Sequence, residues 1–398
     1  MAGISRSRLV CIKAGALASP LIATVTEALA HTSERGHVML LPTGYYLAGG
    51  AVAVAASFLV LALVRPERLE RLASWRWVIG RCGGGRTGVS LAFFVLLIVL
   101  IAAGFWGSRD PLCNPLPLTV WTLFWVDLTL LCGLFGNLWS WINPWYGPYR
   151  LAAGLRGPKA PLRLPASLGY LPAILVLFAF AWFELVYPAP DDPWRLGLVL
   201  SLYWLASFVA MLLFGYGEWT RRGELFSVFF GMIARLSFIE ARSLSKAPSP
   251  GLRSARPPSP RRGEEVGDVA ANLFSPAGRW PEGPDDGASE IFLCLPGAQL
   301  ANAPALPISG VLFLLTALAS VSFDGLMRTF FWLGNNGINP LEFPGRSAVM
   351  GINTAGLIGM SVLLTSAFLL AVWIGGRLLR NERRMAGWTL ARSRSFLI

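Results

Sequence analysis

The chain has 398 residues, of which 54% are hydrophobic and only 14% are charged. This composition excludes an intrinsically disordered chain and a small disulfide-rich protein, and it indicates a protein with several membrane-spanning helices. The formal net charge is +12. We attribute this charge to membrane topology and expect no nucleic-acid partner, because the arginines gather between the apolar runs.

The first 30 residues have the features of a secretory signal peptide. Basic residues precede a short apolar run, Ala14–Val25, and an Ala-x-Ala pattern ends at residue 30. These features predict cleavage before His31, with residues 31–45 as a short exoplasmic segment; an uncleaved short anchor is the alternative. Cleavage would let the new amine and the ring of His31 chelate copper, with His37 as a third ligand. A flexible exposed end is the simpler expectation.

Seven apolar runs are long enough to cross a bilayer as helices, which requires about 20 residues each. They are Tyr46–Val64, Val89–Trp106, Leu118–Leu138, Leu168–Tyr187, Leu196–Phe214, Ile308–Leu333 and Ala348–Ile374. We therefore expect an all-α, polytopic helical membrane protein, with the lipid bilayer as its partner. The connecting segments hold 26 Lys and Arg residues on one side and four on the other. The positive-inside rule then predicts an exoplasmic N-terminus and a cytoplasmic C-terminus.

A polar insert divides these spans into groups of five and two. Residues 46–240 form the predicted five-span bundle, which ends in an amphipathic helix, Glu224–Phe238, on the cytoplasmic surface of the membrane. The insert, residues 241–306, is expected to be a disordered linker because Pro, Ser and Arg dominate its first part. Residues 307–376 hold the last two spans, and residues 377–398 form a basic cytoplasmic tail.

Charged side chains within spans are costly and often functional. Asp127 lies near the middle of the third span, and Glu184 lies near the outer end of the fourth. Asp324 and Arg328 lie four residues apart in the sixth span, so they share a helix face. Asp127, Asp324 and Arg328 are the catalytic candidates, with a carboxylate as general base. The simpler interpretations are a structural ion pair for the latter two and a protonated core carboxyl for Asp127.

A segment rich in Trp and Tyr, Gly136–Tyr149, follows the third span. Such rings are enriched at membrane interfaces, so an aromatic belt is the simpler interpretation. The alternative is a platform that binds an aromatic or amphiphilic ligand. Under that hypothesis the candidate substrate-binding residues are Trp139, Trp141, Asn143, Trp145 and Glu184.

The last span carries small residues every four positions, at Gly351, Ala355 and Gly359. This spacing predicts close packing against another helix. Asn353 and Thr354 lie beside these residues and are expected to form hydrogen bonds between helices.

Several distinctive stretches are Ala30-His31, Leu41-Pro42, Gly136–Arg150, Tyr216–Leu236 and Ser322–Val349. In these stretches the chain resembles bacterial membrane proteins known as fenitrothion hydrolase components, which take part in hydrolysis of an organophosphorus insecticide. The resemblance implies a subunit in the bacterial inner membrane that works with a second membrane subunit, and it assigns no catalytic residue. A transporter, or an accessory protein for complex assembly or metal supply, is the alternative from the residues alone.

Overall fold

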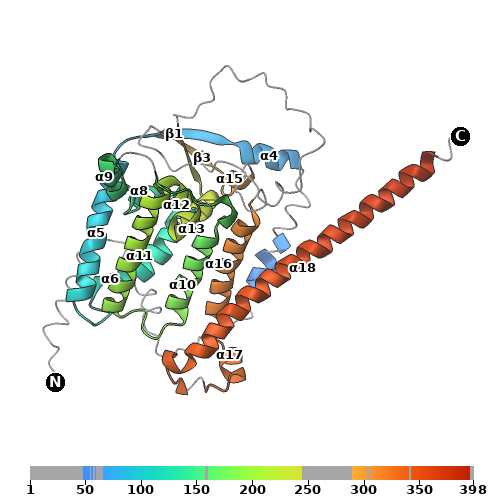
Figure 1. The fold of residues 1–398 in the computed structure, drawn as a ribbon. Helices are drawn as coiled ribbons and strands as arrows, with labels where there is room; N and C mark the ends of the chain where they lie inside the picture. Colours follow the sequence, from blue (N-terminus) through green and yellow to red (C-terminus); the bar gives the residue numbers. More distant parts are fainter. Residues whose placement is uncertain are drawn as a thin grey trace. The chain divides into compact units, whose positions relative to one another are not determined.

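The computed structural model describes residues 66–156, 160–243, 289–339 and 342–394, apart from residues 302, 304 and 305, and some positions between 48 and 59. The predicted signal peptide, the segment with His31 and His37, and most of the first predicted span lie outside the described residues. The described chain is mostly helical (Figure 1). Six of its helices are long and apolar enough to cross a membrane, and they match the other six predicted spans.

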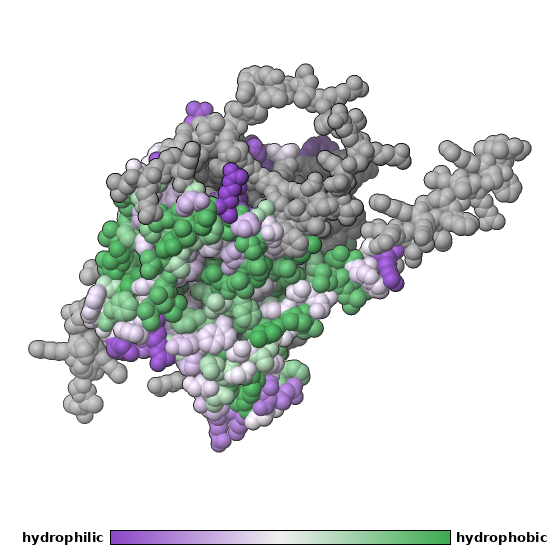
Figure 2. Space-filling model, viewed as in Figure 1, coloured by the Kyte–Doolittle hydropathy of each residue, from purple (hydrophilic) through white to green (hydrophobic). Residues whose placement is uncertain are grey.

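These six spans are built from nine helical elements. They are α5 (Arg86–Trp106); α6, η2 and α7 in succession (Pro115–Leu118, Thr119–Asp127 and Leu128–Phe135); η3 and α10 (Ala166–Leu168 and Leu171–Leu185); α11 (Pro193–Phe214); α16 (Ile308–Met327); and α18 (Arg346–Arg394). Large apolar side chains remain exposed on them; Val95 and Val99 of α5, for example, are each 58% exposed. Figure 2 shows hydrophobic residues over much of the visible described surface. Such surfaces fit contact with the lipid bilayer.

Shorter elements connect the spans. They are α4 (Pro66–Ser74), α8 (Trp139–Ile142), α9 (Tyr146–Arg156), α12 (Tyr216–Arg222), α13 (Leu225–Ile233), η4 (Ala234–Leu236), α15 (Ala298–Ala301) and α17 (Phe330–Asn335). Glycines end two of the spans that precede them: Gly136 follows α7 with φ +91°, and Gly215 follows α11 with φ +87°. Only glycine adopts this backbone region without strain, so it lets the chain turn sharply out of each span.

The expectation of a purely helical protein is wrong in one respect. Strands β1 (Arg76–Cys82), β2 (Ile239–Ser243) and β3 (Ser289–Cys294) form an antiparallel sheet in the order β1-β3-β2. Ion pairs reinforce the register, since Arg76 contacts Glu240 at 2.7 Å and Arg81 contacts Glu290 at 2.9 Å.

The prediction of a disordered linker over residues 241–306 is therefore wrong at both ends of that range. Its first residues belong to β2, and residues 289–301 contain β3 and α15. The apolar run Ile291-Phe292-Leu293 lies within the polar insert and is only three residues long, so its pattern does not predict a strand. The strands that pair with it are distant in the sequence. Residues 244–288 lie outside the described residues.

The prediction that Glu224–Phe238 lies on the membrane surface is also wrong. Helix α13 forms as expected, but Leu225, Phe226, Val228 and Phe230 are buried within the protein. The Phe226 ring packs edge-to-face on Phe124 of η2, with centroids 4.7 Å apart. Aromatic side chains of the protein therefore cover the apolar face that the sequence pattern assigned to lipid.

The described chain divides into two compact units. Of the described residues, unit 1 holds those within Met1–Val176 and Ala189–Ser309, and unit 2 holds those within Leu177–Pro188 and Gly310–Ile398. The fourth predicted span is thus shared between the units instead of belonging wholly to the five-span group.

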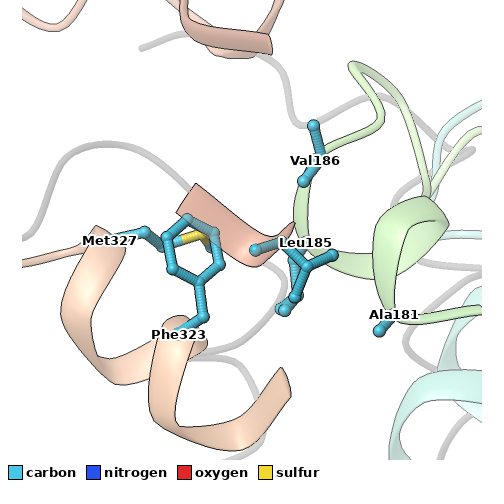
Figure 3. Close-up of a cluster of buried hydrophobic side chains, with 6 residues drawn as sticks. Ala181, Leu185, Val186, Phe323 and Met327 are labelled. Carbon is cyan, nitrogen blue, oxygen red and sulfur yellow. The ribbon is translucent and has the colours of Figure 1, made fainter. Parts of the chain in front are cut away.

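Unit 2 has its own apolar core. Figure 3 shows Phe323 and Met327 of α16 with Ala181, Leu185 and Val186 from α10 and its C-terminal end. Leu357 of α18 completes this cluster, and Phe323 is 0% exposed. Burial of large apolar side chains of this kind contributes about 1.5–3 kcal/mol each.

Hydrogen bonds connect α18 to other helices of unit 2. They involve Asn353 and Thr354, as predicted from the sequence. The Trp332 Nε1–H donates to Asn353 Oδ1 at 3.0 Å, and the Trp182 Nε1–H donates to Thr354 Oγ1 at 3.0 Å. The described residues do not make the expected small-residue contact, however. Among the described residues nothing lies within 4 Å of a Cβ placed on Gly351 or Gly359.

The glycine of α18 that does pack closely is Gly356. A Cβ there would lie 2.4 Å from Phe323 Cε2 and 2.6 Å from Trp332 Cη2. We expect Gly356→Ala to destabilise the protein by about 1–3 kcal/mol, because the rings cannot move freely in a packed core. Gly359→Ala is the matched control and should be neutral or stabilising through helix propensity. Thermal unfolding of both variants in detergent measures the difference; equal midpoints would contradict this packing.

Candidate functional site

A cavity of about 760 Å³ lies in unit 1, at the end where α5 begins and where α7 and α11 finish. Its wall includes most of the segment Gly136–Arg150, parts of α12 and α13, and one or two residues from each strand of the sheet. The aromatic lining residues are Phe135, Trp139, Trp141, Tyr146, Tyr149, Tyr170 and Tyr216, and the basic ones are Arg86, Arg150, Arg221 and Arg235. In Figure 1 the elements α8, α9, α12 and α13 gather beside the strands at this end.

Hydrogen bonds from side chains to the backbone, together with one close backbone approach, hold the segment after α7 in place. The Asn143 side-chain oxygen accepts a hydrogen bond from the Trp145 N–H at 2.9 Å, which forms a tight turn before α9. Ser90 of α5 donates to the Asn143 carbonyl and accepts from the Gly147 N–H at 2.8 Å. At Gly147 the two backbones approach closely, since a Cβ there would lie 3.0 Å from the Leu91 nitrogen. The wall is therefore fixed to a span by main-chain geometry.

Arg86 connects three parts of the wall. It is only 5% exposed, and its Nε–H donates to the Ser140 carbonyl at 2.8 Å. One terminal nitrogen donates to the Tyr216 hydroxyl at 3.1 Å, and the guanidinium lies 3.8 Å from the Tyr146 ring centroid. The planar guanidinium suits this combination of a stacked face and two directed hydrogen bonds.

Burial shifts the pKa of two lining groups that lie outside the spans. It raises the pKa of the Tyr216 hydroxyl to about 12, so this group stays protonated at neutral pH. Burial also lowers the pKa of the Arg235 guanidinium to about 10, which still leaves it charged at neutral pH. At physiological pH the cavity therefore presents a neutral hydroxyl beside positive groups.

Glu224 lies behind the cavity wall and is 0% exposed. Its carboxylate caps α13, accepting from the Phe226 N–H at 3.0 Å and the Ser227 N–H at 2.6 Å. It also accepts from the Tyr203 hydroxyl of α11 and from Trp139 Nε1–H at 3.4 Å. A buried carboxylate with this many donors fixes the helices around it.

The structure brings three of the aromatic-segment candidates to the cavity. Trp139, Trp141 and Asn143 line it. Trp139 and Asn143 are 5% and 1% exposed, so their main contacts are with the protein. Trp145 does not belong to the lining; it is 3% exposed and its Nε1–H donates to the Trp204 carbonyl at 2.9 Å.

The charged candidates lie elsewhere. Asp127 is the last residue of the π-helical η2 in unit 1 and is not among the described lining residues. Glu184, Asp324 and Arg328 belong to unit 2. Asp324 and Arg328 form the ion pair expected from their spacing, at 2.9 Å with partly exposed side chains. The four charged candidates therefore do not join the aromatic segment around one cavity.

Sequence reasoning did not identify Arg86, Tyr216 or Glu224. Signals for two of them exist locally: Arg86 stands where a glycine-rich stretch meets an apolar run, and Glu224 immediately precedes the apolar helix α13. Their contacts cannot be read from local patterns, because Arg86 reaches Ser140 and Tyr216 across distant parts of the chain.

Comparison with protein-family models, with curated proteins and with solved structures finds no match to this chain. Among the described residues, no three His, Cys, Asp or Glu side chains form a group that could hold a metal ion. The copper hypothesis concerns His31 and His37, which lie outside that part of the chain.

Proposed function

We propose that this chain is a multi-pass membrane subunit of an organophosphorus-ester hydrolase, and that its cavity in unit 1 binds the ester. The observation that carries the proposal is the joint presence of aromatic faces and guanidinium groups in one cavity of about 760 Å³. Aromatic faces suit an aryl substituent, and guanidinium groups suit the phosphoryl oxygen or sulfur, on which negative charge develops. A cavity of this volume is in the usual range for small-ligand sites.

The resemblance to fenitrothion hydrolase components supports the same cavity. Two of the similar stretches, Gly136–Arg150 and Tyr216–Leu236, supply most of its wall. Hydrolysis of such an ester adds water across the P–O(aryl) bond, which yields a diester monoanion, a phenol and a proton. The described lining residues include no Asp, Glu or His, so we assign them binding and charge stabilisation. A second membrane subunit would supply the group that activates water.

The test uses the purified chain in lipid nanodiscs and a dimethyl nitroaryl phosphorothioate as the ligand. We expect binding that quenches tryptophan fluorescence, and a loss of affinity of about tenfold or more for Trp141→Ala, since stacking is removed. Trp106→Ala is the matched control, because Trp106 is 84% exposed and is not a lining residue.

Hydrolysis is measured in parallel with washed membranes that contain this chain alone. Release of nitrophenol above the vector control would place the catalytic groups in this chain and contradict the assignment of a binding role. Absence of ester binding by correctly inserted protein would overturn the proposal and favour a transporter or an accessory protein.

A further inference from the structure

The cavity in unit 1 carries an excess of positive charge. Its described lining includes four arginines and neither aspartate nor glutamate. Glu218 lies next to this group, but its carboxylate is shared between Arg221, at 3.5 Å, and Arg222, at 2.5 Å. One carboxylate therefore serves two guanidinium groups, and the local charge remains positive.

Two of the lining arginines approach the same aromatic ring. Arg86 lies 3.8 Å and Arg150 lies 6.0 Å from the centroid of Tyr146. Both guanidinium charges therefore lie beside one lining ring, where protein replaces part of the surrounding water and screens their fields less. An anion bound near this ring would be attracted by both charges.

Two further arginines, Arg221 and Arg235, line the same cavity. Arg221 has a side chain that is only 21% exposed, and Arg235 is partly buried in η4. Burial lowers the pKa of Arg235, which means that water stabilises its charge incompletely. A bound anion would stabilise this partly desolvated charge further, and guanidinium groups are well suited to hold phosphate oxygens in pairs.

From this charge and geometry we infer that the cavity binds phosphodiester monoanions more tightly than neutral phosphate triesters. Trp141 and Tyr149 would contact the apolar substituent, while Arg150, Arg221 and Arg235 hold the charged oxygens. The inference deepens the proposed function and rests on it, because it concerns the same cavity. Two sources share this chemistry: a soluble dialkyl phosphate, such as hydrolysis of the ester releases, and the headgroup of a phospholipid.

The experiment measures affinities of the purified chain in nanodiscs of zwitterionic lipid. The probes are diethyl phosphate as the anion and triethyl phosphate as its neutral analogue. We expect the anion to bind about tenfold or more tightly than the neutral compound, with an affinity that falls as salt is added. A competition measurement with dihexanoyl phosphatidylglycerol distinguishes the two sources. If this lipid displaces diethyl phosphate, the natural ligand is a phospholipid headgroup; if it does not, the ligand is a soluble anion.

Variants assign the effect to the cavity. Arg150 lines the cavity and is exposed, so Arg150→Gln should fold normally and reduce the anion affinity about tenfold. Arg150→Lys should retain part of the affinity. Arg81→Gln is the matched control, because Arg81 has a 70% exposed side chain outside the lining and should not affect binding.

The outcomes separate this inference from the proposed function. If the aryl ester binds but the anion binds no better than triethyl phosphate, the inference is overturned and the proposed function stands. If the anion binds through Arg150 but the aryl ester does not bind, the inference stands and the proposed function fails. If Arg150→Gln and Arg81→Gln lower the anion affinity equally, the anion is attracted by the general surface charge and not by the cavity, and the inference is overturned.

Discussion

Replacement of Glu224 by alanine should lower the free energy of unfolding by about 3–5 kcal/mol, the largest effect expected for a single polar residue in unit 1. The substitution would leave the Tyr203 hydroxyl and the N–H groups of Phe226 and Ser227 without their buried acceptor. It would also remove the N-terminal cap of α13, which is worth about 1 kcal/mol on its own. Titration with a denaturing detergent in mixed micelles measures the change.

A matched acidic residue provides the control. Glu290 pairs with Arg81, whose side chain is 70% exposed, so Glu290→Ala should cost no more than about 1 kcal/mol. Glu224→Gln keeps one acceptor oxygen and should fall between the two variants. Equal stability of Glu224→Ala and Glu290→Ala would show that the Glu224 contacts do not hold the helices together.

Replacement of Arg86 by lysine should lower stability by about 2–3 kcal/mol and weaken ligand binding in the cavity, although the charge is retained. A lysine ammonium cannot stack on Tyr146 while it donates to both the Ser140 carbonyl and the Tyr216 hydroxyl. Helices α8, α9 and α12 would then lose their common partner at the start of α5. Ester affinity and thermal stability of the purified variant give the two measurements.

Arg81→Lys is the control for Arg86→Lys, because Arg81 makes an exposed ion pair that lysine can also form. We expect this control to leave both quantities within the error of the wild type. A normal stability together with unchanged ester binding in Arg86→Lys would contradict the assignment of Arg86 as the residue that joins the cavity wall.

The membrane spans could be predicted because hydropathy acts on continuous segments. Each run had to satisfy its backbone internally, and six of the predicted runs are helices. Four agree with the prediction within three residues at both ends, whereas α16 ends at Met327 and not at Leu333, and α18 continues beyond Ile374 to Arg394. The pairing of Asp324 with Arg328 was predictable for the same reason, since a spacing of four residues fixes the contact locally.

The sheet and much of the cavity depend on contacts between distant residues. The partners of β3 include β1, which precedes it by more than two hundred residues in the sequence. The aromatic segment was visible in the sequence as a candidate platform, but whether each ring faced a cavity or the core was not. Trp141 and Trp145 have the same residue type four positions apart, yet only Trp141 lines the cavity. Long-range packing decided between them.

The most direct test asks whether the cavity is a ligand site on the side of the membrane that the positive-inside rule predicts to be cytoplasmic. Thr220 lines the cavity, and its hydroxyl bonds only within its own helix, so Thr220→Cys is a conservative probe. In a background with the native cysteines changed to serine, we measure its reaction with a membrane-impermeant maleimide. The account predicts labelling only from the cytoplasmic side, in inverted membranes, and slower labelling when diethyl phosphate or the aryl ester is present. Labelling from the exoplasmic side, or a rate that neither ligand changes, would contradict it.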